Sequence, residues 1–263
     1  MIAILLCAGF ATRLYPLTKN FPKPLLPVAG RPAIDYLMDQ VINLPGIESI
    51  HVVTNASFFD HFAQWRDKWL PDIEPHGITL NLHNDGSMDN ENRLGAVADL
   101  AFVLRSLEIT TGALVAAGDN IFRFSLKPIW QQFLDDDKNY LLALPEKDPN
   151  RIKRTGVLEL GPDDRVVRFH EKPNDPPSSW TCPAIYFLKP SALSRVDEYL
   201  AQPDARDAPG YFISYLVTRE PVYAIKVMGK SIDIGTIESY EEANAVLSRE
   251  PVILDEAIKG SND

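Results

Sequence analysis

The segment from Leu6 to Pro32 carries the residues best suited to hold a polyphosphate. An apolar run leads into a loop of small residues around Gly9, where backbone N–H groups are expected to lie open at the end of a strand. Two cations, Arg13 and Lys23, follow, and prolines on both sides of Lys23 stiffen the chain that carries it. Because open N–H groups and fixed cations neutralise phosphate oxygens, this segment predicts a triphosphate site.

Asp119 and the pair Glu171-Lys172 are charged residues in later segments whose roles residue type alone does not decide. Asp119 follows Gly118 at the end of a run of small apolar residues, and open α/β sheets bind ligands at such strand ends. On residue type alone, an aspartate after a glycine is also typical of a turn or a helix cap. Glu171-Lys172 would by itself be an exposed ion pair with little effect on stability. These residue types therefore leave structural and chemical roles open.

Other common catalytic patterns are missing from the sequence. The loop at Gly9 matches neither the Gly-x-x-x-x-Gly-Lys-Ser/Thr pattern of P-loops nor the Gly-x-Gly-x-x-Gly pattern of dinucleotide-binding folds. The five histidines lack the spacing of metal ligands, and no Ser/His/Asp or Cys/His arrangement is recognisable. We therefore expect neither a zinc site nor a nucleophile of these kinds.

Apolar runs alternate with amphipathic helical patterns in the first part of the chain. Helices are expected after Pro32, from Phe58 to Trp69, and over Leu94–Leu107. The predicted strands between them are Ile2–Cys7, Ser49–Thr54, Ile78–His83 and Ala113–Gly118. This alternation predicts an α/β fold with a single doubly wound, mostly parallel sheet of the Rossmann-like kind.

The second half of the chain has a different pattern. Gly156–Leu160 and Arg165–Glu171 flank a turn and predict a hairpin, which would form a small antiparallel element on the substrate side. The other predicted strands are Tyr140–Leu144, Pro183–Leu188 and Val222–Val227, and the other predicted helices are Ser191–Leu200, Gly210–Arg219 and Glu238–Ser248. No linker divides the chain, so we predict one domain over 1–248, with halves at 1–120 and 121–248, and a short tail at 249–263.

Composition excludes several classes of protein. The 263 residues are 45% hydrophobic and 24% charged, which is ordinary for a globular protein. The net charge of −10 argues against a nucleic-acid surface, because such a surface needs a basic stripe. Two cysteines fit a reducing compartment, and no apolar run approaches the roughly 20 residues of a membrane span. We therefore expect a cytoplasmic protein that binds neither nucleic acid nor membrane.

The motifs resemble, in order, those of one enzyme family. The run from Cys7 to Thr18 is similar to the Ala-Ala-Gly-x-Gly-Thr-Arg-Leu-x-Pro-Leu-Thr signature of the sugar-1-phosphate nucleotidyltransferases, or pyrophosphorylases. This family includes glucose-1-phosphate thymidylyltransferase and uridylyltransferase. The run from Pro22 to Pro32 continues the signature as Pro-Lys-Pro-Leu-Leu-Pro-Val-x-Gly-x-Pro. Cys7 and Ala11 depart from it, and because Ala11 replaces a glycine, we expect the loop to hold phosphates slightly differently.

The resemblance implies a role for each matched residue. It makes 1–120 the nucleotide-binding half and 121–248 the sugar-phosphate-binding half, with Arg13, Lys23 and Asp119 as catalytic residues. It implies that Asp119 and Asp233 bind Mg²⁺. The implied nucleotide-binding residues are Ala8, Gly9, Phe10, Ala11, Thr12, Arg13, Lys23, Asn84, Gly95 and Asp119. The implied sugar-phosphate-binding residues are Gly156, Glu171, Lys172, Ala184 and Tyr186.

The sequence does not decide which nucleotide base and which acceptor the protein would use. UTP or dTTP is favoured as the donor, but Asn84 also resembles phosphocholine cytidylyltransferases of the same fold. The alternatives are therefore a cytidylyltransferase acting on phosphocholine or another phosphorylated alcohol, and a non-catalytic regulatory subunit that binds a nucleotide-sugar. Asp207–Phe212 either borders the same pocket or only begins a helix. Relatives commonly form dimers or tetramers, so a homo-oligomer is compatible with the resemblance.

Overall fold

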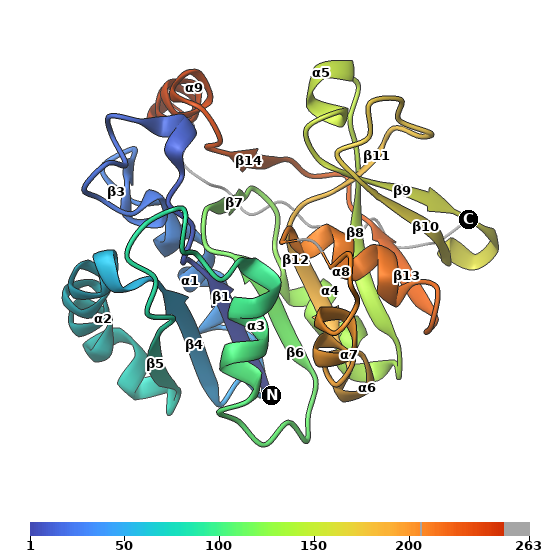
Figure 1. The fold of residues 1–263 in the computed structure, drawn as a ribbon, viewed down its shortest axis with the longest axis horizontal. Helices are drawn as coiled ribbons and strands as arrows, with labels where there is room; N and C mark the ends of the chain where they lie inside the picture. The colour runs from blue at the N-terminus through green and yellow to red at the C-terminus, as the bar shows by residue number, and fades with distance from the viewer. Residues whose placement is uncertain (206, 250–263) are drawn as a thin grey trace.

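The computed structural model describes residues 1–205 and 207–249, and Figure 1 shows their ribbon. The strands are β1 (Ile2–Leu6), β2 (Pro27–Val28), β3 (Arg31–Pro32), β4 (Ser49–Thr54), β5 (Thr79–Asn84), β6 (Ala113–Ala117), β7 (Asn120–Phe122), β8 (Asn139–Pro145), β9 (Gly156–Leu160), β10 (Val166–Glu171), β11 (Trp180–Cys182), β12 (Ile185–Leu188), β13 (Val222–Lys226) and β14 (Ser231–Asp233). The helices are α1 (Ala33–Val41), α2 (Phe59–Ile73), α3 (Ala96–Leu104), α4 (Lys127–Asp135), α5 (Pro149–Ile152), α6 (Pro190–Leu193), α7 (Val196–Leu200), α8 (Pro209–Leu216) and α9 (Ile237–Arg249). Apart from Arg249, the predicted tail at 249–263 lies outside the described residues.

One large sheet runs through the described part of the chain in the order β10-β9-β11-β8-β12-β6-β1-β4-β5, with β13 also paired to β8. β1 lies parallel to β4 and β6, and β5 extends the parallel edge. β12 runs antiparallel between β6 and β8, and the predicted hairpin of β9 and β10 joins the sheet through β11. The prediction of an α/β fold with a mostly parallel sheet and an antiparallel element is confirmed.

Alternate residues of the central strands pack into two separate hydrophobic layers. Ala3 and Leu5 of β1 join the layer that contains the buried side chains of α1, α2 and α4. Ile4, between them, joins the layer formed with α3, α6, α7 and α8. In Figure 1, α3, α7 and α8 lie in front of the sheet, whereas α1 and α4 lie behind it. Side chains of a strand alternate between the two faces, so helices on both faces make a doubly wound sheet.

The C-terminal helix holds the segment that follows the predicted phosphate loop. Tyr240 Oη of α9 donates to Pro27 O at 2.7 Å, and Ala29 N donates to Asn244 Oδ1 at 2.9 Å. A small hydrophobic cluster, which includes residues of α1, β2, β7 and α9, supports these bonds. The first and last parts of the described chain therefore lie side by side (Figure 1).

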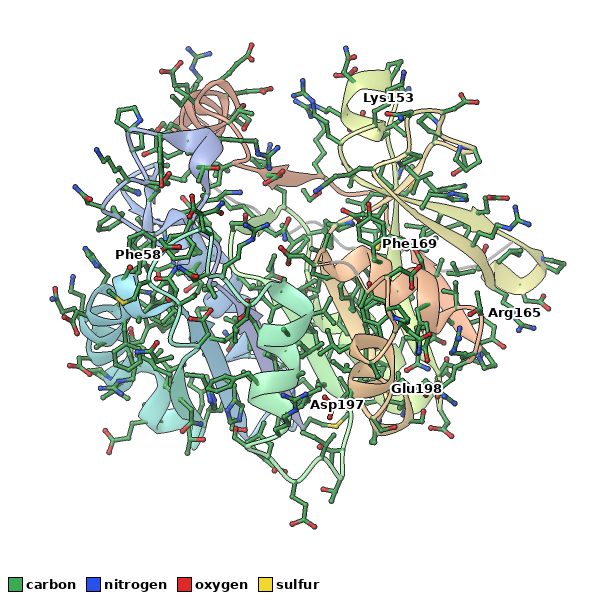
Figure 2. The ribbon with its side chains drawn as sticks, viewed as in Figure 1. Phe58, Lys153, Arg165, Phe169, Asp197 and Glu198 are labelled. Carbon is green, nitrogen blue, oxygen red and sulfur yellow. The ribbon has the colours of Figure 1, made fainter. Side chains whose placement is uncertain are left out.

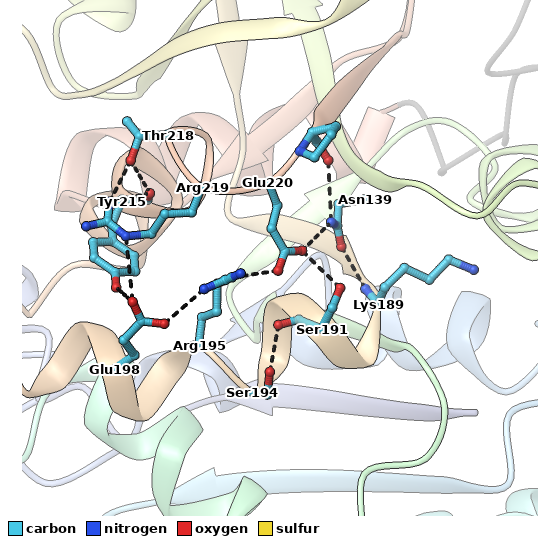
Figure 3. Close-up of polar contacts among 11 residues, drawn as sticks. Asn139, Lys189, Ser191, Ser194, Arg195, Glu198, Tyr215, Thr218, Arg219 and Glu220 are labelled. Carbon is cyan, nitrogen blue, oxygen red and sulfur yellow. Dashed lines mark hydrogen bonds and ion pairs between the residues drawn. The ribbon is translucent and has the colours of Figure 1, made fainter.

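The structure differs from the sequence expectations where elements are short or depend on distant partners. The helix expected over Ser191–Leu200 is two helices, α6 and α7. At their junction, Arg195 Nε donates to Glu220 Oε1 at 2.6 Å, and Glu220 also accepts from Ser191 Oγ at 2.9 Å (Figure 3). The interpretation of the sequence did not include α4, or the short strands β7, β11 and β14. The division of one domain into two halves stays a prediction.

None of the described helices has both the length and the apolar character that a membrane crossing requires.

A pair of histidines lies at the parallel edge of the sheet. His51 Nδ1 of β4 and His83 Nε2 of β5 are 2.9 Å apart, and Ser49 Oγ lies 2.9 Å from His51 Nε2. Burial, with a smaller effect from His83, lowers the pKa of His51 to about 4. Burial also lowers the pKa of His83. The folded protein therefore favours the neutral pair, because an N–H···N bond between the rings needs one unprotonated nitrogen.

This pair predicts a loss of stability in acid. An unfolded histidine has a pKa near 6.5, so between about pH 6.5 and 4 the unfolded chain binds more protons at His51 than the folded chain does. The contribution of His51 to the free energy of unfolding should fall by about 2–3 kcal/mol over this interval. Urea unfolding at a series of pH values should show that His51→Gln lacks this change and that His76→Gln, at an exposed position, keeps it. A His51→Gln protein with the wild-type pH slope would contradict the assignment.

Candidate active site

The loop after β1 leaves a run of backbone donors open. Cys7 N donates to Val53 O at 2.8 Å and closes the parallel ladder. From Ala8 to Ala11, no backbone N–H has a hydrogen-bond acceptor among the residues described. Thr18 Oγ1, which is almost fully buried, donates to Ala11 O at 2.8 Å and fixes the loop. Open N–H groups at the carboxyl end of a strand are suited to anionic oxygens.

Ala11 adopts a backbone conformation that glycine adopts at lower cost. Its φ is 48° and its ψ is 45°, in the left-handed region. Alanine thus keeps the loop in a glycine-like conformation, and the following residues Thr12–Leu14 form one turn of 3₁₀ helix.

A cavity of about 290 Å³ lies beside this loop at the carboxyl ends of β1 and β6. Its lining includes these residues that the sequence analysis expected to bind substrate: Ala8, Gly9, Ala11, Arg13, Lys23, Gly95, Asp119 and Ala184. It is also lined by residues that were not among those expected to bind substrate, such as Cys7, Pro24, Arg93, Ala96 and Asp99. Asp207 and Pro209 line it as well, so the segment that begins α8 borders the pocket and also starts a helix.

Lys23 connects Asp119, which lines this cavity, with Asp233, which does not. Its Nζ forms an ion pair with Asp119 Oδ2 and lies 3.3 Å from Asp233 Oδ1. The Lys23 side chain is only 11% exposed. Burial alone would lower the pKa of Lys23, but the charges and hydrogen bonds of the two carboxylates raise it above its ordinary value. Lys23 is therefore a fixed cation at the edge of the cavity.

The register of two short strands explains why these carboxylates lie together. β7 pairs antiparallel with β14, so that Asn120 is opposite Asp233. Asp119 immediately precedes Asn120 in the turn after β6 and is thus brought to the same end of the ribbon. Carboxylate oxygens are ligands that Mg²⁺ prefers, and it commonly uses one or two of them together with water and phosphate oxygens. No group of three or more His, Cys, Asp or Glu side chains suited to a metal occurs within the described residues. Two carboxylates are of a ligand type that suits Mg²⁺, and a shared magnesium site stays a prediction.

Arg13 lies on the 3₁₀ turn with its side chain exposed and lines the same cavity. It has no ion-pair partner among the residues that the structure describes, in contrast to Lys23. Its charge is therefore free to act on an anion that enters.

Four of the predicted acceptor residues do not line this cavity: Gly156, Glu171, Lys172 and Tyr186. Glu171 of β10 is opposite Gly156 of β9, and Lys172 Nζ is 3.3 Å from Glu171 Oε1. The Glu171 side chain is 10% exposed and packs on Gly210 of α8, where an added Cβ would collide with Glu171 Oε2. Because Pro209 lines the cavity, this contact places the Glu-Lys pair beside it.

β12 carries the two remaining acceptor-side residues at or near its start. Ala184 lines the cavity, and its carbonyl accepts from Ala117 N at 2.9 Å. Tyr186 is buried next to Cys182 and Glu171. Burial, followed by the charges of these two neighbours, raises the pKa of Tyr186 well above its usual value, so its hydroxyl stays protonated.

Three predicted nucleotide-binding residues do not line the cavity. Phe10 is buried against Phe58, with 5.8 Å between the ring centroids, and Figure 2 shows Phe58 in the N-terminal half near α2. Thr12 starts the 3₁₀ turn with its side chain exposed. Asn84 Oδ1 accepts from Gly86 N at 2.9 Å within its own loop. Figure 2 also labels Phe169, which lies close to α8 in the other half.

Asp207, in the segment that the sequence analysis left as a pocket border or a helix start, bonds to the segment at the N-terminus of α3. Asp207 accepts from Ala96 N at 2.7 Å and from Arg93 Nε at 3.1 Å. Gly95 has a φ of +97°, and an added Cβ would lie 2.6 Å from Asp207 Oδ1. Glycine is therefore favoured at position 95 for two reasons: the positive φ disfavours a side chain, and Asp207 occupies the space that a Cβ would fill. No local pattern predicts this contact, because the partners are more than a hundred residues apart in the chain.

The conformation of Ala11 gives a stability prediction. Ala11→Gly should raise the free energy of unfolding by about 0.5–1 kcal/mol, because glycine removes the left-handed strain at the cost of some extra entropy in the unfolded chain. Ala8→Gly, in the same loop without a left-handed φ, should lower stability or leave it unchanged. Urea unfolding of both variants checks this, and a clear loss of stability in Ala11→Gly would be the contrary result.

The chain is similar to known proteins over most of its length. The chain is 27% identical over 260 residues to a UTP–glucose-1-phosphate uridylyltransferase of Haloferax volcanii, covering 95% of this chain and 98% of that protein. It is 29% identical over 254 residues to a glucose-1-phosphate thymidylyltransferase of Neisseria meningitidis, covering 92% of this chain and 81% of that protein. It is 25% identical over 247 residues to the bifunctional protein GlmU of Methanocaldococcus jannaschii, covering 94% of this chain but only 54% of that longer protein.

A crystal structure of UDP-glucose pyrophosphorylase complexed with UDP-glucose has the same fold, with a TM-score of 0.78 at 19% identity over 95% of this chain and 98% of that one. The family model described as nucleotidyl transferase matches residues 2–250, which include the open loop, Lys23 and both aspartates. The chain therefore belongs to the nucleotidyl transferase family.

Proposed function

We propose that the protein transfers a nucleotidyl group from an NTP to a sugar 1-phosphate, giving an NDP-sugar and pyrophosphate. The observation that carries this proposal is the contact of Lys23 with both Asp119 and Asp233 at the cavity beside the open loop. This arrangement puts cationic, donor and carboxylate groups at one place, as transfer between two phosphate-bearing substrates requires. The uridylyl- and thymidylyltransferases among the relatives support UTP or dTTP as the favoured donor.

The reaction needs positioning and charge neutralisation rather than a protein nucleophile. An oxygen of the sugar phosphate attacks the α-phosphorus of the NTP in line, and the bond from that phosphorus to the bridging β-phosphate oxygen breaks. Pyrophosphate leaves with the electron pair of that bond. Arg13 and Lys23 neutralise the charge that develops on the triphosphate and on the leaving group.

Asp119 and Asp233 would hold Mg²⁺ in this scheme. The ion, when bound, neutralises phosphate charge and polarises the α-phosphate. Both carboxylates contact Lys23, so the lysine and the metal ligands belong to one cluster and would act on the same phosphates.

The Glu171-Lys172 pair is proposed to hold the acceptor. Lys172 carries its half-exposed ammonium at the end of β10 and is suited to the phosphate of the sugar. The largely buried carboxylate of Glu171 is suited to accept hydrogen bonds from sugar hydroxyl groups. The contact of Glu171 with Gly210, next to a cavity-lining residue, supports this placement.

A cytoplasmic location and a homo-oligomer stay predictions.

Pyrophosphate release tests the proposed activity. A matrix of UTP, dTTP, CTP, ATP and GTP against several sugar 1-phosphates and phosphocholine should give turnover with UTP or dTTP and a sugar. Turnover only with CTP and phosphocholine would replace this function with the cytidylyltransferase. No turnover with any pair would favour a regulatory, non-catalytic protein.

Substitutions at the cluster should lower the rate without unfolding the protein. Lys23→Met and Asp119→Asn are each expected to reduce the rate about 10²–10³-fold, because each removes a charge that is preorganised for the phosphates. Lys19→Met, at an exposed cation in the same segment that does not line the cavity, is the matched control and should keep near-normal activity. Near-normal Mg²⁺-dependent pyrophosphate release by Asp119→Asn would refute the assignment of Asp119.

A further inference from the structure

Asp99 is an acidic side chain in a helix that is otherwise apolar. α3 reads Ala-Val-Ala-Asp-Leu-Ala-Phe-Val-Leu, and Asp99 is its one charged residue. The side chain is 4% exposed and lines the cavity at the end where Gly95 and Asp207 lie. Its Oδ1 atom is buried and has no hydrogen-bond partner among the residues described. Because a buried acceptor without a partner is costly, this atom points to a ligand.

The acidic neighbours of Asp99 are already engaged. Both carboxylate oxygens of Asp85 accept from Ser87 Oγ, at 2.7 and 2.8 Å, and Oδ1 also accepts from Ser87 N at 2.7 Å. Asp207 is bonded to Ala96 N and Arg93 Nε, as described above. Among the three acids at this end of the site, Asp99 is thus the one with an unused oxygen.

The surroundings keep Asp99 neutral at ordinary pH. Burial, then the charge and hydrogen bond of Asp85, and last the charge of Asp207 raise the pKa of Asp99 to about 8. The charged and titratable groups that face it are Asp85 from the loop after β5, Asp207 before α8, Arg93 before α3 and the thiol of Cys7 after β1. In this neutral form the carboxyl proton is shared with Asp85, and Oδ1 is left as an acceptor without a partner among the described residues.

This end of the cavity is suited to the nucleoside rather than to phosphate. Arg13 and Lys23 line the cavity near the open loop, whereas the acids Asp85, Asp99 and Asp207 are grouped at α3. Phosphate oxygens are repelled by carboxylates, but a base carries N–H groups that can donate to them. Asn84, the residue expected to bind the base, uses its side-chain oxygen in its own loop.

We propose that Asp99 is the residue that recognises the base, and that its Oδ1 accepts a hydrogen bond from the N3–H group of a uracil or thymine ring. This inference rests on the proposed function. Uracil and thymine carry a donor at N3, which complements the unpaired acceptor Oδ1. Cytosine has an acceptor at N3, which would face Oδ1 unfavourably.

Binding of UTP and of N3-methyl-UTP to the full chain, measured by calorimetry, tests the proposal. The methyl group removes the N3–H donor. The wild-type protein should bind UTP at least about tenfold more tightly than N3-methyl-UTP, because the methylated base leaves a buried acceptor unpaired. Asp99→Asn keeps a carbonyl acceptor and should keep this preference. Asp99→Ala and Asp99→Ser should bind UTP more weakly and lose most of the preference.

Matched controls separate recognition from charge and from folding. Asp89→Asn makes the same change of charge at an exposed position in the loop before α3 and should bind as the wild type does. A folded-state pKa above the unfolded value of about 3.9 means that the contribution of Asp99 to stability is lost as pH rises towards 8. Asp99→Asn should therefore gain stability relative to the wild type over this range, which reports on the buried carboxyl without any ligand.

The outcomes distinguish the inference from the function on which it rests. If either Asp99→Ala or Asp99→Ser keeps the wild-type preference for UTP over N3-methyl-UTP, Asp99 does not recognise the base and the inference fails alone. The same holds if the wild type binds both nucleotides equally. If the wild type releases pyrophosphate only with nucleotides other than UTP and dTTP, the proposed donor and the inference both fail.

Discussion

The site depends on one buried ammonium group that contacts two carboxylates. Lys23 Nζ pairs with Asp119 and Asp233, which are about one hundred and two hundred residues away in the chain. The charges of Lys23 and Asp119 would each be costly to hold at low exposure without a partner, because burial disfavours an unpaired ion. Together they fix the relative positions of the loop after β1, the turn after β6 and the end of β14. The cavity lies where these three segments meet.

Much of the remaining structure serves to keep this contact in place. The turn at Lys23–Leu25 follows Pro22, whose carbonyl accepts from Leu25 N at 3.0 Å. α9 holds the next segment through Tyr240 and Asn244, and the β7–β14 ribbon sets the position of Asp233. A helix at the end of the described chain therefore stabilises a loop near its beginning. Changes in α9 that never touch the cavity are thus able to alter its geometry.

The sequence was most informative where a function depends on a continuous segment. The open loop, Arg13, Lys23 and the central parallel strands all follow from local patterns of small, basic and apolar residues. The contact of Asp119 with Asp233 required the register of two three-residue strands, which no local pattern encodes. The interpretation of the sequence found both aspartates only because they match family motifs. Phe10 illustrates the opposite case, since its place in the motif does not reveal that its side chain packs on Phe58.

Asp99 was missed, and the contact of Asp207 with the N-terminus of α3 could not be predicted, for a related reason. An aspartate within an apolar helix has no distinctive spacing, and its meaning depends on Asp85 and on the cavity that the fold creates. Asp207 contacts the N-terminus of α3, and its partner Ala96 lies 111 residues earlier in the sequence. Specificity residues of this kind emerge from packing between distant segments, whereas the phosphate loop can be recognised from neighbouring residues.

A double-mutant cycle on the free energy of unfolding tests the central role of Lys23 most directly. Lys23→Met, Asp119→Asn and the double variant should give a coupling of at least about 1 kcal/mol, because both side chains are largely shielded from water. The same cycle with Asp233, which is 68% exposed, should give a smaller coupling. Additive effects of Lys23→Met and Asp119→Asn, with no measurable coupling, would contradict the view that this contact organises the site.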